Sequence, residues 1–70
     1  MMDTKYREEF DQILNELRGL YKERGDYARI YVRQLMIEGI LTQMMLDDVP
    51  INTICDYELE YRGVVGNAWP

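Results

Sequence analysis

Histidine is absent from this sequence, and Cys55 is its only cysteine. The chain can therefore form neither a Cys/His zinc cluster nor an internal disulfide. It also lacks the parts of a Ser–His, Cys–His or His–metal catalytic mechanism. With no base to activate its thiol, Cys55 is expected to be a small buried apolar residue. These absences predict a non-enzymatic protein with no metal site and no cofactor.

Long apolar runs are absent as well. The most apolar stretch, residues 30–46, is interrupted by polar side chains such as Arg33 and Glu38, so it does not predict a membrane span. The first residues lack the apolar segment of a signal peptide, and a lone thiol suits a reducing compartment. We expect a cytoplasmic protein without membrane contact.

What the sequence does contain is a high apolar content in a short chain. Seventy residues, 47% of them hydrophobic, are expected to form a single helical domain. A chain of this size buries only about 60% of its unfolded surface. Small domains usually gain further stability from disulfides, metals or partner subunits. Because disulfides and metals are excluded, either very good packing or association between copies of the chain must supply it, and the composition favours association.

The N-terminal part has the spacing of an amphipathic helix over about 4–24. Apolar residues at steps of three and four fall on one face, namely Tyr6, Phe10, Ile13, Leu14, Leu17, Leu20 and Tyr21. Gly25 then suits the left-handed position just past a helix end, and Asp26 suits the N-cap of the next helix. This pair predicts a tight turn in an antiparallel helical hairpin, with the second helix over about 27–48.

The second helix is apolar on two opposite sides when its residues are placed at about 100° per position. One side contains Ile30, Ile37, Leu41 and Met44, and the other contains Ala28, Val32, Leu35, Gly39 and Leu46. The first helix can cover only one of these sides. We therefore predict a homo-oligomer in which another copy covers the second side. The alternative is a monomer in which the C-terminal segment covers it.

The C-terminal segment carries two competing patterns. Proline at position 50 ends the second helix, because it disfavours helical conformation in the residue before it. A capping box over 53–56 then indicates a short helix over about 53–62. Residues 57–62 also alternate strictly between apolar and polar, which is the period of a half-buried strand. We favour the helix over the strand, and we expect an extended tail at 63–70.

Charge is distributed unevenly along the chain. The net charge is −5, and residues 47–70 carry five acidic side chains against Arg62 alone. Such a balance disfavours nucleic acid, which binds basic patches. Acidic and aromatic side chains together are typical of protein-binding surfaces, and the predicted partner-binding set is Tyr57, Glu58, Glu60, Tyr61 and Trp69. The alternative is an ordinary solubilising surface.

A second candidate site lies at the start of the second helix. Arg29 and Arg33 are one turn apart and can grip a phosphate or carboxylate, while Tyr27 and Tyr31 can stack on a base. These four residues predict a site for an anionic small molecule such as a nucleotide, at an interface between subunits. The alternative is that the arginines pair with acidic residues of the first helix. The three methionines Met36, Met44 and Met45 are expected to fill the core.

No family motif is recognisable, whether a phosphate-binding loop, a zinc spacing, a nucleophile elbow or a helix-turn-helix signature. Short, charged helical chains of this kind are common among regulators and inhibitors from viruses and mobile elements. The sequence thus predicts a mainly α-helical homo-oligomer that binds another protein and regulates or inhibits it. The alternative function is an oligomer that binds or sequesters an anionic small molecule.

Overall fold

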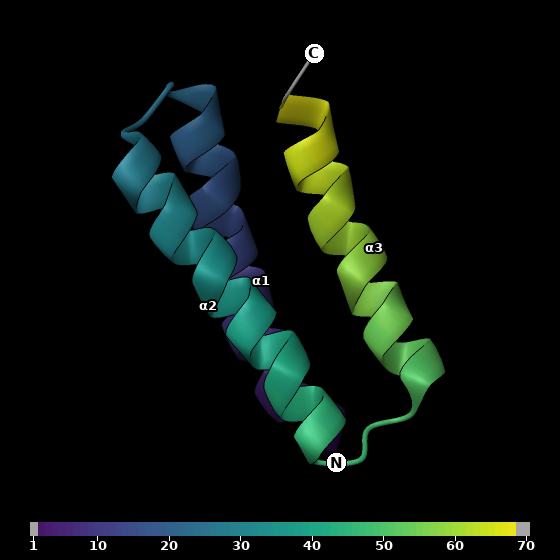
Figure 1. Cartoon of the computed structure of the whole chain (residues 1–70). Helices are drawn as coiled ribbons and strands as arrows, with labels where there is room; N and C mark the ends of the chain where they lie inside the picture. Colours follow the sequence, from purple (N-terminus) through teal and green to yellow (C-terminus); the bar gives the residue numbers. More distant parts are fainter. Residues whose placement is uncertain (1, 69–70) are drawn as a thin grey trace.

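The computed structural model describes residues 2–68, with side chains over 5–66, and this part of the chain is all-helical. Helix α1 spans Met2–Lys22, α2 spans Tyr27–Leu46 and α3 spans Ile51–Ala68. Figure 1 shows α1 and α2 close together, while α3 runs back toward the end of the molecule where those two are joined. No strand occurs within 2–68, so the helical interpretation of residues 53–62 is confirmed.

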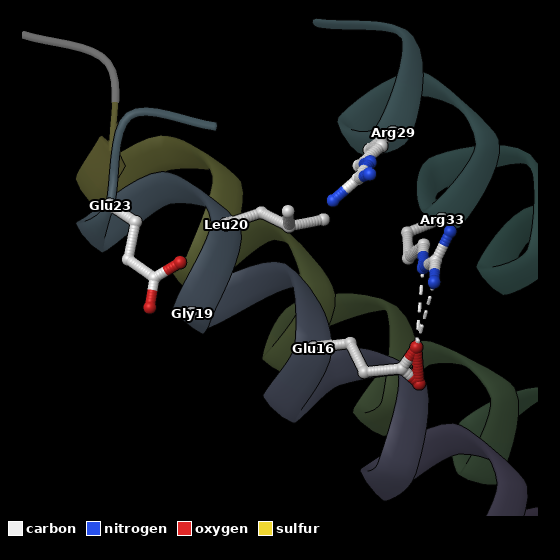
Figure 2. Close-up of a pocket in the computed structure, with 6 residues that line it drawn as sticks. All are labelled: Glu16, Gly19, Leu20, Glu23, Arg29 and Arg33. Carbon is white, nitrogen blue, oxygen red and sulfur yellow. Dashed lines mark hydrogen bonds and ion pairs between the residues drawn. The ribbon is translucent and has the colours of Figure 1, made fainter. Parts of the chain in front are cut away.

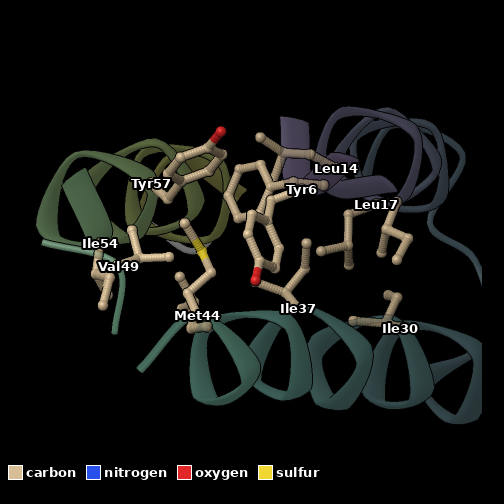
Figure 3. Packing of buried hydrophobic residues seen from close by; sticks show 12 residues of the cluster. Tyr6, Leu14, Leu17, Ile30, Ile37, Met44, Val49, Ile54 and Tyr57 are labelled. Atoms are coloured by element: carbon tan, nitrogen blue, oxygen red, sulfur yellow. The ribbon is translucent and has the colours of Figure 1, made fainter. Parts of the chain in front are cut away.

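One apolar core lies between the three helices. Side chains from all three converge on it in Figure 3, and its buried members are Tyr6, Phe10, Ile13, Leu14, Leu17, Ile30, Ile37, Leu41, Met44, Val49, Ile54 and Tyr57. Leu20 and Tyr21 pack against it in half-buried positions. The predicted core-facing stripe of the first helix and the first predicted side of the second helix are therefore confirmed.

The second predicted apolar side of α2 faces away from this core. Val32, Leu35 and Leu46 are 47%, 48% and 72% exposed, and Ala28 and Gly39 are exposed as well. Helix α3 packs instead against the core that α1 and α2 already share. The described part of the C-terminal segment therefore does not cover the second side of α2.

Helix α3 is longer than the sequence predicted. It begins at Ile51 and continues through Ala68, so the segment 63–68, which was expected to be extended, is helical. Gly63 does not take a positive φ and so does not end the helix. The buried stripe continues past it at steps of three and four, through Ile54, Tyr57, Tyr61 and Val64. Residues 69 and 70 of the predicted tail lie outside the described residues.

The turn between α1 and α2 closes with a Schellman motif. The amides of Arg24 and Gly25 donate to the carbonyls of Tyr21 and Leu20, at 3.2 and 2.7 Å. The left-handed residue is Arg24, with φ 53°, and not Gly25 as the sequence predicted. Glycine suits position 25 for a different reason, because a Cβ there would lie 3.0 Å from the Leu20 side chain and 3.2 Å from its carbonyl oxygen.

Asp26 caps the N-terminus of α2, as predicted. Its carboxylate accepts a hydrogen bond from the amide of Ala28 at 3.0 Å, which satisfies a donor of the first helical turn. The other end of α2 repeats the Schellman geometry, with Asp48 left-handed at φ 60° and the amide of Val49 donating to the carbonyl of Met44 at 3.0 Å. Val49 and Met44 are both buried, so this turn brings the chain back to the core before α3 begins.

Replacing Arg24 with glycine should stabilise the protein, because a left-handed backbone costs an L-residue roughly 1–2 kcal/mol and costs glycine little. We expect Arg24→Gly to raise the free energy of unfolding by about 0.5–1 kcal/mol, measured by urea denaturation. Arg24→Ala is the matched control, because it removes the same charge but keeps the strain. Equal stabilities of the two variants would contradict this assignment.

Candidate functional site

The two arginines of the predicted anion site line a cleft between α1 and α2. The cleft has a volume of about 490 Å³, and its other lining residues are Glu16, Gly19, Leu20 and Glu23. Figure 2 shows Arg33 paired with Glu16, with the guanidinium 3.2 Å from the carboxylate. No ion pair of Arg29 is found among the described residues, although its side chain also lines the cleft.

The charges of this cleft are balanced. Two carboxylates accompany the two guanidinium groups, so the cleft has no excess positive charge to attract an anion. Tyr27 and Tyr31 are 73% and 61% exposed, and neither lines the cleft. A single chain therefore brings Arg29 and Arg33 together without the tyrosines, and Arg33 pairs with the first helix as the alternative interpretation expected. The nucleotide site at a subunit interface stays a prediction.

Two members of the predicted partner-binding set hold α3 against α1. Tyr57 is only 4% exposed, and its ring meets that of Phe10 edge to face with 4.9 Å between the centroids. Glu60 accepts two hydrogen bonds of 2.9 Å from Arg7, whose guanidinium carbon lies 4.4 Å from the centre of the Tyr57 ring. Sequence reasoning missed this contact, because no local pattern links residues that are 53 positions apart.

Arg7 binds two carboxylates at once. Its Nη2 lies 2.6 Å from Asp11 on the same helix and 2.9 Å from Glu60 on α3. The hydrogen bonds that it donates to Asp11 and Glu60 raise the pKa of Arg7 above its ordinary value. The guanidinium therefore stays charged. Because Glu60 accepts two hydrogen bonds from it, much of the hydrogen-bonding capacity of the Glu60 carboxylate is used within the fold.

Asp47 is also engaged within the chain. It accepts hydrogen bonds from the Tyr6 hydroxyl and from the Gln43 amide, and the first of these joins α1 to the end of α2. The same bond lowers the pKa of the Asp47 carboxyl and raises the pKa of Tyr6. At neutral pH the carboxylate is charged and the hydroxyl is protonated, so only part of the acidic excess is left for a partner.

Glu58 and Tyr61 line a second groove, which lies between α2 and α3 and has a volume of about 420 Å³. Glu58 pairs with Arg62 one turn along α3. Burial raises the pKa of Tyr61, and the charge of Glu38 adds to this effect. The groove combines these groups with apolar side chains, including Leu41, Met45, Ile51 and Ile54. Trp69, the last member of the predicted set, lies outside the described residues.

Three residues that were expected in the core are exposed. Cys55 is exposed beside this groove, because Ile54 takes the inward position and the next helical residue is turned by about 100°. Met36 and Met45 are 45% and 54% exposed, whereas Met44 is fully buried. The prediction of a buried thiol is therefore wrong, and the core assignment of the methionines holds for Met44 alone.

The most continuous apolar feature of the described surface is the outward side of α2. Seven of the nine exposed large apolar side chains belong to this helix, and three of the seven, Val32, Leu35 and Leu46, lie along the middle of its outward side. Along its outward side, residues at steps of four and three form an uncharged row, here called the outer stripe: Ala28, Val32, Leu35, Gly39, Thr42 and Leu46. On α3, by contrast, Leu59 is a single exposed leucine with Asp56 and Gly63 on the same side.

Comparisons of the chain with protein-family models, with curated proteins and with solved structures found no match. Within residues 2–68, no helix is both long and apolar enough to cross a bilayer. The described side chains also include no cluster of three or more acidic or cysteine groups that could hold a metal ion.

Neutralising Glu60 and neutralising Glu58 should have different effects on stability. We expect Glu60→Gln to lower the free energy of unfolding by about 0.5–1 kcal/mol, because it weakens a paired contact between α1 and α3. Glu58→Gln weakens only the exposed ion pair with Arg62 on the same helix, and it should change the free energy of unfolding by less than about 0.5 kcal/mol. Urea denaturation of both variants checks this, and a larger loss for Glu58→Gln would be inconsistent with the role given to Glu60.

Proposed function

We propose that the protein is a small non-enzymatic interaction protein that assembles with copies of itself and binds a protein partner, which it regulates or inhibits. The observation that carries this proposal is the outer stripe of α2. Leu35, at its centre, is 48% exposed, and Leu46, at its end, is 72% exposed. Continuous exposed apolar surface on a small domain marks an interaction site.

Self-association would supply the additional apolar burial that a short chain lacks. Twelve buried residues among the described side chains make a small core, and neither an internal disulfide nor a Cys/His zinc site is available to strengthen it. Covering the outer stripe with another copy adds apolar burial without any change within the three-helix fold. In this proposal α1 and α2 act as an antiparallel hairpin that presents the stripe.

The partner-binding surface proposed on α3 is narrower than the sequence suggested. Tyr57 and Glu60 are used to hold α3 in place, so the surface centres on Glu58 and Tyr61 at the groove between α2 and α3, and Trp69 stays a predicted member of the set. Carboxylates beside apolar side chains complement a partner segment that carries basic and apolar residues. The lone thiol of Cys55 suits a reducing compartment, and this supports the cytoplasm as the proposed location.

A charge in the outer stripe should prevent self-association. For the wild-type protein, we expect the sedimentation coefficient to rise with concentration between about 1 and about 100 μM. Leu35→Glu should keep it at the value of the smallest species throughout, because each copy would bury a charged carboxylate in an apolar contact.

Leu59→Glu is the matched control for this experiment. It places the same charge at an exposed leucine, 65% exposed, on the outer side of α3, and it should sediment like the wild type. Circular dichroism of each variant verifies that the helices are intact. A wild-type protein that stays monomeric over the whole concentration range would overturn the proposed self-association.

A further inference from the structure

We infer that the outer stripe of α2 packs antiparallel against the outer stripe of a second copy, about a two-fold axis at the level of position 37. This inference rests on the proposed self-association and specifies its partner and its geometry. Position 37 lies midway between Ala28 and Leu46, the two ends of the stripe. The alternating steps of four and three are those of a two-helix seam.

Antiparallel pairing about this axis places small side chains opposite larger ones. The layers across the interface are then Ala28 with Leu46, Leu35 with Gly39, and Val32 with Thr42, each formed twice. Alternation of large and small residues across facing positions lets side chains interdigitate without voids. The stripe is therefore complementary to itself when its direction is reversed.

Parallel pairing would not have this complementarity. It would set Leu35 against a second Leu35 and Gly39 against a second Gly39, so that crowded and empty layers alternate. In the single chain, a Cβ added at Gly39 would have no neighbour within 4 Å. The fold of one chain therefore gives no steric reason for a glycine at this position, whereas the antiparallel layer with Leu35 does.

The absence of charge from the outer stripe leaves a second copy little repulsion to overcome on this side. A two-fold contact brings the same surface of both copies together, and a chain of net charge −5 repels itself wherever its acids meet. No charged residue belongs to the outer stripe, whose flanks carry Arg29 and Glu38. The two copies of Glu38 approach the axis along one flank, but this side chain lies toward α3, where it lines the groove with Arg62.

The area of the stripe sets the strength of the contact. Helix α2 has 20 residues, so it is about 30 Å long, and its outward side offers roughly 400 Å² on each copy. The total of about 800 Å² is below the range of about 1,200–2,000 Å² that stable complexes bury. The dimer should therefore be reversible and should dissociate on dilution into the micromolar range.

Disulfide trapping in the full chain tests the geometry. In a Cys55→Ser background, we expect Ala28→Cys and Leu46→Cys proteins to form a mixed disulfide when they are oxidised together. Each protein alone should form little disulfide, because equivalent positions at the ends of an antiparallel pair are about 27 Å apart. Mass spectrometry distinguishes mixed dimers from dimers of one variant.

The other outcomes separate the two proposals. Disulfides formed equally well by each variant alone would overturn the antiparallel arrangement. Absence of disulfides from a protein that still dimerises in sedimentation would overturn the outer stripe as the contact between copies. A protein that does not associate at all would overturn the proposed self-association together with the geometry.

A glycine substitution provides the second variant. Gly39→Leu should weaken the dimer by about tenfold or more, because it places two leucines in one layer. Gly63→Leu is the control, since Gly63 is also exposed, helical and without neighbours within 4 Å of an added Cβ, and it should leave the dimer unchanged. A tighter dimer with Gly39→Leu is the result expected of a parallel pair, and it would overturn the inference.

Discussion

Apolar side chains on two opposite sides of α2 impose the main constraint on this protein. The inward side, with Ile37 and Met44 fully buried, joins α1 and α3 in one core. Within residues 2–68 there are two other helices, and both pack on that same inward side. The outward side, which includes Val32 and Leu35, therefore cannot be covered by the described part of the chain. The proposed self-association is a way to remove these side chains from water.

Polar contacts between the helices draw on the acidic residues that gather toward the C-terminus. Arg7 donates two hydrogen bonds to Glu60, and its guanidinium lies over the ring of Tyr57. The hydroxyl of Tyr6 donates a hydrogen bond to Asp47. These contacts fix α3 and the end of α2 relative to α1. Of the remaining acidic side chains, Glu58 lines the groove between α2 and α3, where it pairs with Arg62. In the proposed function, Glu60 thus serves the fold and Glu58, on a neighbouring turn of α3, serves recognition.

Periodicity predicted the core of α1 and α2 well, because steps of three and four identify one side of a helix directly. The sequence-based prediction was wrong beyond Gly63. The glycine suggested the end of the helix there, although Val64 continues the buried stripe of α3. Contacts such as that of Arg7 with Glu60 were not predictable, since they depend on how distant helices pack. The sequence did indicate that α2 has a second apolar side, and only the packing of α3 showed that this side is left exposed.

The most direct test of the account is nuclear magnetic resonance on an equal mixture of isotope-labelled and unlabelled protein. An isotope-filtered experiment detects proton contacts between copies and suppresses those within one copy. The account predicts contacts from the methyl groups of Leu35 to the α-protons of Gly39 in the other copy. Contacts between copies that involve other surfaces, with none from the outer stripe of α2, would contradict it.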